Sequence, residues 1–222
     1  MADPNLSNII LTPYQIKHIL PNAKFLLIFR NPVDRLYSSY NFFPLLIRNS
    51  GLYMNQTRKA AAKQMFESKS PEDFHNKVVE SLQWFKNCTV HYPNSHKCLF
   101  WNERKELIHY FINHLQMGFY GITLKLWLEV FPRDQFKIIR LEDYSLNTMA
   151  VLSDIFSFLD LEPMNDNMRE VIADSKVSNF GRRKNEHGPM LPETRRILLE
   201  FYKPYNKILA DILKDPKFLY PT

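Results

Sequence analysis

The sequence predicts an α/β fold that is rich in helix, and two strand–helix units carry this prediction. The first unit begins with the apolar run Phe25–Phe29, whose length is typical of a buried strand. The run ends at Arg30-Asn31-Pro32, where asparagine can cap a helix and proline is favoured at the first helical position. A second strand over residues 135–144 is followed by an amphipathic helix over residues 147–159.

The end of the first strand has the residues of an anion-binding site. Open α/β sheets bind ligands at the carboxyl ends of their strands, and the start of a helix favours a negative charge. Arg30 adds a planar set of donors suited to phosphate, and Ser38 on the second helical turn adds a hydroxyl. The alternative is an ordinary strand–helix turn with a solvated arginine.

Composition is that of a globular protein with one domain over residues 1–222. The chain is 45% hydrophobic and carries a formal net charge of +6, which suggests acidic partners such as phosphorylated cofactors, sulfated glycans or nucleic acid. The alternative is that this modest positive charge only aids solubility. No run of 18 apolar residues predicts a transmembrane helix, and the first residues lack the order of a signal peptide.

The two cysteines, Cys88 and Cys98, flank a short polar stretch that a disulfide can close. His91 and His96 raise zinc binding as an alternative, but their spacing is unlike the paired ligands of zinc sites, so we expect no metal. Two free thiols remain a third possibility. A disulfide would imply an oxidising compartment, as would glycosylation at the sequons that begin at Asn5, Asn55 and Asn87.

Other helices are predicted from periodicity and end signals. Ser70 and Pro71 open one helix, and Gly118 and Gly121 lie within another, where they permit close packing. The acidic pair Glu142-Asp143 is interpreted as capping and loop hydrogen bonding rather than as a general base or metal site. The predicted helices cover residues 13–20, 32–48, from 71 to the cysteine loop, 107–130, and 191–213 with a kink or split at Pro204, whereas residues 49–70 are an insertion or loop.

The segment from Arg30 to Tyr40 resembles the 3′-phosphate-binding segment of sulfotransferases that use 3′-phosphoadenosine 5′-phosphosulfate. In that family an arginine at the strand end and a serine eight positions later hold the 3′-phosphate, which implies this role for Arg30 and Ser38. Asn31 departs from the aspartate that is usual there, but it preserves capping. A second resemblance follows in the right order, with Trp127–Pro132, the second strand, Leu141-Glu142-Asp143 and a helix.

A basic loop over residues 178–190 completes the resemblance. In glycosaminoglycan sulfotransferases a late basic loop closes over the nucleotide, and Arg182, Arg183 and Lys184 look like its cofactor-binding residues. The glycine before these cations lets the backbone approach a phosphate. Phe180 is a further candidate, for stacking on adenine. A solvated basic loop is the alternative.

The whole chain is similar to the carbohydrate sulfotransferases that modify N-acetylgalactosamine in chondroitin and dermatan sulfate. The resemblance implies a P-loop-NTPase-like fold with a parallel sheet, 3′-phosphoadenosine 5′-phosphosulfate as co-substrate, an anionic glycosaminoglycan acceptor, and the Golgi lumen, where full-length members are membrane-anchored. The first strand and the loop that holds the 5′-phosphosulfate are expected to be missing, so no catalytic base is named. Two alternatives remain, a catalytically incomplete fragment that binds nucleotide or sulfated glycan, and a nucleic-acid-binding module.

Overall fold

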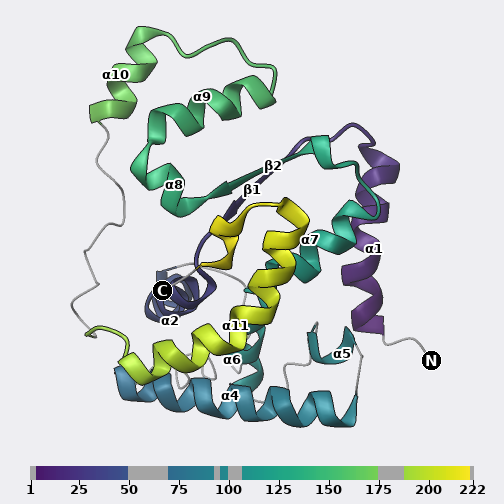
Figure 1. Ribbon diagram of the computed structural model, residues 1–222, viewed down its shortest axis with the longest axis vertical. Helices are drawn as coiled ribbons and strands as arrows, with labels where there is room; N and C mark the ends of the chain where they lie inside the picture. Colours follow the sequence, from purple (N-terminus) through teal and green to yellow (C-terminus); the bar gives the residue numbers. More distant parts are fainter. Residues whose placement is uncertain (1–3, 50–69, 93–95, 100–106, 175–187, 221–222) are drawn as a thin grey trace.

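The computed structural model describes residues 4–49, 70–92, 96–99, 107–174 and 188–220, and it has the expected helix-rich α/β architecture (Figure 1). The strands are β1 (Phe25–Phe29) and β2 (Phe136–Arg140). The longer helices are α1 (Pro4–Ile19), α2 (Pro32–Asn49), α4 (Pro71–His91), α6 (Leu107–Gln116), α7 (Tyr120–Leu128), α9 (Thr148–Phe158), α10 (Asp166–Asp174) and α11 (Pro192–Leu213). The shorter ones are α5 (His96–Leu99), α8 (Leu141–Leu146) and the 3₁₀ turns η1 (Arg133–Gln135) and η2 (Pro216–Leu219).

β1 and β2 pair in parallel, with Phe25 opposite Phe136 and Phe29 opposite Arg140. Both strands therefore end at the same edge, and the turn after β1 lies beside the start of α8. The expected second strand was too long at its carboxyl end, because helix α8 begins directly at Leu141. This early helix brings the acidic pair Glu142-Asp143 into its first turn rather than onto the strand.

The sheet lies between α7 and α11 on one side and α8 and α9 on the other (Figure 1). On the first side the ring of Phe25 lies 5.2 Å from Trp127, 4.7 Å from Phe131 and 4.8 Å from Phe136, measured between ring centroids. Such aromatic contacts add to the burial of apolar area. Alternate residues of β1 point to the other side, where Ile28 is 54% exposed.

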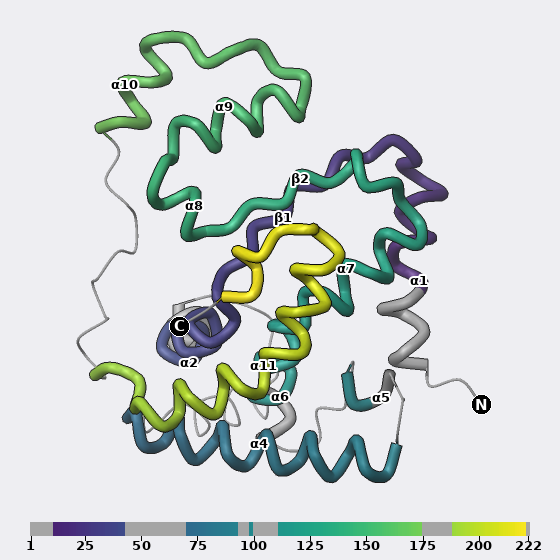
Figure 2. The backbone as a smooth tube through the Cα atoms, in the orientation of Figure 1, coloured from purple at the N-terminus to yellow at the C-terminus, as the bar shows by residue number. Residues whose placement is uncertain are grey.

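A second apolar cluster joins α2, α4, α6 and α11, whose tubes run together in Figure 2. Its largest side chains, which are almost fully buried, are Leu36, Tyr40, Phe74, Phe111, Phe119, Leu198 and Tyr202. The α2 residues of this cluster pack the helix against α4, α6 and α11, which holds the amino end of α2 at the sheet edge.

The helix expected over residues 107–130 is wrong as a single element, because the chain breaks between α6 and α7. At the break, Gly118 lies so close to Tyr202 that a Cβ atom there would be 2.5 Å from its ring, while the Tyr202 hydroxyl donates to the Leu115 carbonyl at 2.7 Å. Gly121 likewise lets α7 approach the backbone of Leu209 in α11. Both glycines thus serve close packing, as the sequence predicted, but Gly118 also lies at the break after α6, whereas Gly121 is inside α7.

Three further expectations are corrected. The first helix begins at Pro4 rather than Pro13, and Pro13 sits inside it at the loss of one backbone hydrogen bond. Pro204 does not split α11, which runs unbroken over 22 residues and is held along its length by packing on α2, α4 and α7. Helix α10 lies in a segment for which the sequence suggested no element. By contrast, Ser70 caps α4 as predicted, accepting from the Asp73 amide at 3.1 Å.

The disulfide prediction is confirmed, since Cys88 in α4 and Cys98 in α5 are bonded with an S–S distance of 2.03 Å. Both sulfur atoms are therefore used, which removes the free-thiol and zinc alternatives at this loop. His91 instead donates from Nδ1 to the Asn87 carbonyl at 2.8 Å. Asn87 is exposed on α4, whereas Asn55 and the side chains of Asn5 and His96 lie outside the described part. No helix in the described ranges is both long and apolar enough to span a membrane.

Candidate functional site

The candidate site is the turn from Arg30 to Pro32 between β1 and α2. The Asn31 side chain accepts from the Val33 amide at 3.0 Å, and the Asn31 carbonyl accepts from the Arg35 amide at 2.9 Å. Asn31 is thus the cap that the sequence predicted, with Pro32 at the first position of an 18-residue helix. The turn places the positive end of the α2 dipole at the sheet edge, where an anion is favoured.

Glu142 fixes this turn from the first turn of α8, directly after the neighbouring strand β2. Its Oε1 atom accepts from the Asn31 amide at 2.8 Å. Arg140 lies beside it, with Nε at 3.9 Å from Glu142 Oε2 and a second nitrogen at 3.6 Å from Asp143 Oδ1. The interpretation of Glu142-Asp143 as loop hydrogen-bonding residues is therefore confirmed for Glu142.

Tyr120 and Arg35 support the turn from behind. Phe29, the last residue of β1, stacks on Tyr120 with ring centroids 4.5 Å apart. Burial raises the pKa of Tyr120, opposed by the Arg35 guanidinium and by a hydrogen bond to the Arg30 backbone. Arg35 also donates to the carbonyl of His114 at the end of α6. The contacts of Arg35 therefore stabilise the fold.

Arg30 and Ser38 are the candidate ligand-binding residues that the structure describes. Arg30 is partly buried at the strand end, and Ser38 is exposed six residues into α2, about 9 Å along the helix axis from Pro32. Among the described residues, neither side chain makes a hydrogen bond or ion pair. Their donors are therefore available to a ligand at the amino end of α2.

The predicted basic loop cannot be compared residue by residue, because Phe180, Arg182, Arg183 and Lys184 lie outside the described residues. The described chain resumes at Gly188, whose carbonyl accepts from the Tyr37 hydroxyl at 2.8 Å. Tyr37 is the immediate neighbour of Ser38. The chain that follows the basic segment is thus anchored against α2, near the candidate anion site.

Sequence reasoning missed the residues that support the turn. Arg35 contacts His114, and Ser39 Oγ lies 3.1 Å from His114 Nδ1, although the two segments are more than 70 residues apart. Asp34 pairs with Arg195 at 2.6 Å across a still larger separation. Of these residues, only Arg35 could have been noticed in the sequence. It is a charged residue beside the apolar positions of a helix face that is otherwise buried.

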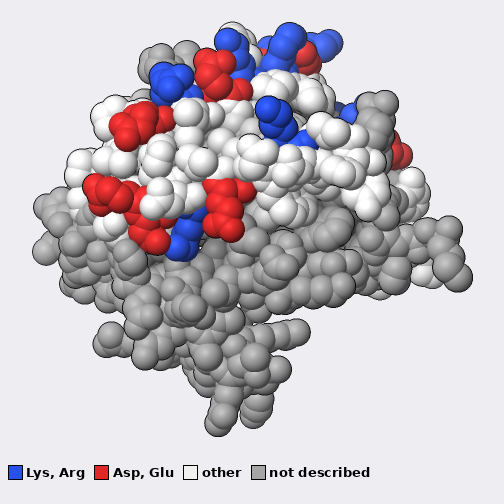
Figure 3. Space-filling view, turned by 90° about the horizontal axis from the view of Figure 1, so that it is seen from below, with Lys and Arg blue, Asp and Glu red and all other residues white. Residues whose placement is uncertain are grey.

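Surface charge does not single out a nucleic-acid interface. On the face shown in Figure 3, lysine and arginine side chains are interspersed with aspartate and glutamate, and they form no continuous basic patch over the described part. Several cations are also neutralised locally, as in the pairs Lys77–Asp73 and Lys207–Asp211, both at 2.7 Å. The described part of this face therefore gives no indication of a nucleic-acid interface.

The family described as "Sulfotransferase domain" matches residues 9–194. Carbohydrate sulfotransferase 15 of Homo sapiens and that of Mus musculus are each 35% identical over 213 residues, which is 96% of this chain and 34% of those proteins. Membrane-associated sulfotransferase kil1 of Dictyostelium discoideum is 26% identical over 235 residues, covering 87% of this chain and 47% of that protein.

Among solved structures, a sulfotransferase from Alicyclobacillus acidocaldarius matches with a TM-score of 0.50 and 19% identity, over 95% of this chain and 63% of that one. This likeness shows the fold. The chain spans about a third of the length of the mammalian relatives.

Proposed function

Because the chain belongs to the sulfotransferase domain family, we propose that it transfers a sulfuryl group from 3′-phosphoadenosine 5′-phosphosulfate to a hydroxyl group of a sugar. The proposed acceptor is an anionic glycosaminoglycan, with N-acetylgalactosamine of chondroitin or dermatan sulfate as the sugar that is modified. The proposed location is the Golgi lumen, an oxidising compartment consistent with the Cys88–Cys98 disulfide.

The observation that carries the proposal is the Arg30 turn. A capped helix start and a partly buried arginine lie at the carboxyl edge of a parallel strand pair, and an exposed serine lies about 9 Å further along the same helix. The side-chain donors of Arg30 and Ser38 are not used elsewhere in the described part. We assign the 3′-phosphate of the nucleotide to Arg30 and Ser38. A phosphate at a helix start is favoured by the dipole, and a guanidinium adds charge-assisted hydrogen bonds.

Arg182, Arg183 and Lys184 are proposed to neutralise the same nucleotide. The support is the position of Gly188, which follows them closely in sequence and bonds to Tyr37 beside Ser38.

In the proposed reaction the bond between sulfur and the bridging oxygen of the donor breaks, and a bond from sulfur to the sugar oxygen forms. The sugar hydroxyl releases its proton, and adenosine 3′,5′-bisphosphate leaves. Positioning and positive charge on the donor oxygens supply most of the rate in transfers of this kind. The described residues account for the 3′-phosphate part of this arrangement.

A second candidate function is binding of the nucleotide without transfer. It is favoured by one observation, that neither β1 nor β2 is followed by a glycine-rich loop that could hold a 5′-phosphosulfate. Measurement of sulfate transfer to unsulfated chondroitin, beside measurement of nucleotide binding, separates the two functions.

The proposal is tested by Arg30→Ala. Loss of charge-assisted hydrogen bonds should weaken binding of adenosine 3′,5′-bisphosphate by roughly 2–3 kcal/mol, measured by calorimetry. Arg196→Ala is the matched control, because Arg196 is exposed on α11 and carries the same charge. An Arg30 variant that binds like the Arg196 variant would remove Arg30 from the site.

A further inference from the structure

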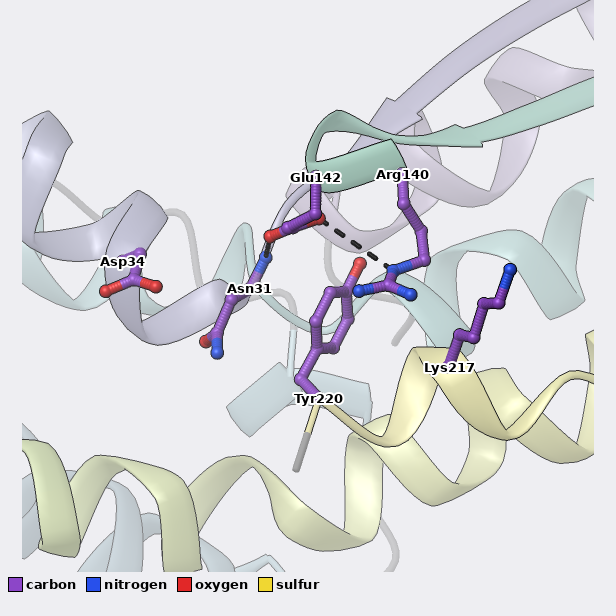
Figure 4. A pocket seen from close by; sticks show the side chains of 6 residues that line it. All are labelled: Asn31, Asp34, Arg140, Glu142, Lys217 and Tyr220. Carbon is purple, nitrogen blue, oxygen red and sulfur yellow. Dashed lines mark hydrogen bonds and ion pairs between the residues drawn. The ribbon is translucent and has the colours of Figure 1, made fainter. Parts of the chain in front are cut away.

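A cavity of about 280 Å³ lies at the carboxyl edge of β2, beside the Arg30 turn, of which Asn31 forms part of the lining. It is lined by Asn31, Asp34, Arg140, Glu142, Lys217 and Tyr220, which come from the start of α2, the β2–α8 junction and the chain around η2 (Figure 4). This volume corresponds to about nine water molecules. Arg30 is not among the lining residues, so the cavity is not the proposed 3′-phosphate site.

Three polar atoms of this lining are buried and lack a hydrogen-bond partner among the described residues. They are Arg140 Nε, Glu142 Oε2 and the hydroxyl oxygen of Tyr220. The Tyr220 residue is only 4% exposed, and its hydroxyl points toward the space between Glu142 and Arg140 (Figure 4). A buried polar group without a partner destabilises the fold, so three of them on one cavity point to a ligand.

The three atoms are close to one another but do not form hydrogen bonds with one another. Arg140 Nε and Glu142 Oε2 are 3.9 Å apart, which is too long for a hydrogen bond. The other oxygen of Glu142 is occupied by the Asn31 amide. Burial and the nearby Glu142 carboxylate raise the pKa of Tyr220, so its hydroxyl stays protonated at neutral pH. The cavity thus offers both donors and acceptors.

The charges of the lining select the kind of ligand. A cation would meet Arg140 and Lys217, and an inorganic anion would meet the carboxylate of Glu142. A hydroxyl group fits both, because it can accept from Arg140 and donate to Glu142 at the same time. Asp34 is already paired with Arg195, which leaves Asn31 and Lys217 at the rim for further hydroxyls.

We propose that this cavity binds a neutral, hydroxyl-rich ring, one sugar unit of a saccharide, at a subsite separate from the nucleotide phosphates. The proposal rests on the proposed function only for its expectation that the natural ligand is a saccharide. The sugar hydroxyls form the hydrogen bonds that Arg140, Glu142 and Tyr220 do not make within the described part of the protein.

The test uses methyl N-acetyl-β-galactosaminide as the probe and saturation-transfer NMR titration of the whole chain. Tyr220→Phe removes only the hydroxyl, and Lys217→Ala removes a cation from an exposed residue at the rim. Each should weaken saccharide binding roughly 3- to 10-fold, the effect of one hydrogen bond. Lys203→Ala, an exposed lysine of α11 that does not line the cavity, should bind as the unchanged protein does.

A thermal-unfolding measurement accompanies the titration. Tyr220→Phe should be at least as stable as the unchanged protein, since the hydroxyl has no described partner to lose. If this variant is less stable, the hydroxyl is satisfied within the fold and the inference fails.

The absence of saturable saccharide binding would overturn the proposal, and so would binding that Tyr220→Phe and Lys217→Ala leave unchanged. Displacement of the sugar by millimolar sodium sulfate, lost in Lys217→Ala, would show an anion site instead. Each variant is also titrated with adenosine 3′,5′-bisphosphate. Retained nucleotide binding without saccharide binding refutes only the cavity proposal, whereas the reverse refutes only the assignment of Arg30.

Discussion

Glu142→Ala should both destabilise the fold and weaken nucleotide binding, because Glu142 ties the Arg30 turn to the start of α8. Its Oε1 atom is the acceptor for the Asn31 amide at 2.8 Å, and its second oxygen partly balances the charge of Arg140. Alanine leaves the amide of the turn without its acceptor and leaves Arg140 with only Asp143 nearby.

The size of the effect follows from the contact. A hydrogen bond to a charged group contributes about 1.5–3 kcal/mol, and the site is partly buried, so we expect a loss of about 2 kcal/mol in the free energy of unfolding. The Arg140–Glu142 contact adds little at its long distance. Glu142→Gln keeps an oxygen acceptor of the same shape and should lose about half as much.

Urea denaturation gives the free energy of unfolding, and calorimetry with adenosine 3′,5′-bisphosphate gives the affinity. Asp143→Ala is the matched control, because Asp143 has the same charge and also faces Arg140, but its contact is 3.6 Å long and its side chain is 38% exposed. Exposed pairs of this kind contribute about 0–1 kcal/mol. If Glu142→Ala and Asp143→Ala were equally stable and bound nucleotide equally well, Glu142 would not position the turn.

Three other predictions concern the fold. Gly121→Ala should destabilise the protein by about 1–2 kcal/mol in urea denaturation, because the new Cβ atom would lie 2.7 Å from the Leu209 amide nitrogen, and overpacking outweighs the helix propensity of alanine; a variant of unchanged or increased stability would contradict this packing. Replacing Cys88 and Cys98 together by serine should lower the free energy of unfolding by about 2–3 kcal/mol, as a short closed loop predicts, and a reducing agent should then have no further effect. Burial raises the pKa of Tyr220, so the unfolded chain loses this proton near pH 10 while the folded chain keeps it; this tyrosine should add about 1.4 kcal/mol per pH unit to the loss of stability above about pH 10, beside the other buried tyrosines, and Tyr220→Phe should lower the total slope by that amount, whereas an unchanged slope would count against the burial of Tyr220.

The strand–turn–helix unit that carries the proposed anion site was predictable because its determinants are local. A strand end, a capping asparagine, a first-turn proline and the spacing of Arg30 and Ser38 are all read within one short segment. The Ser70 cap of α4 is of the same kind, and the Cys88–Cys98 bond joins residues only ten apart. Signals of this type depend on backbone preferences that tertiary structure rarely reverses.

The support of the site was not predictable because its contacts are distant in sequence. Nothing near Glu142 shows that it reaches the Asn31 amide, and Tyr220 meets Arg140 only after η2 returns the chain to the sheet edge. The break between α6 and α7 depends in the same way on Tyr202, which fills the space at Gly118. Periodicity describes the face of a helix, but it does not identify the partner that the face meets.

The central claim is that the Arg30 turn binds the 3′-phosphate of an adenine nucleotide. Calorimetric titration of this chain with adenosine 3′,5′-bisphosphate, with adenosine 5′-phosphate as the control, tests it most directly. The account predicts saturable binding of the bisphosphate and much weaker binding of the monophosphate. Equal affinity for the two nucleotides, or no binding by a chain shown to be folded, would contradict it.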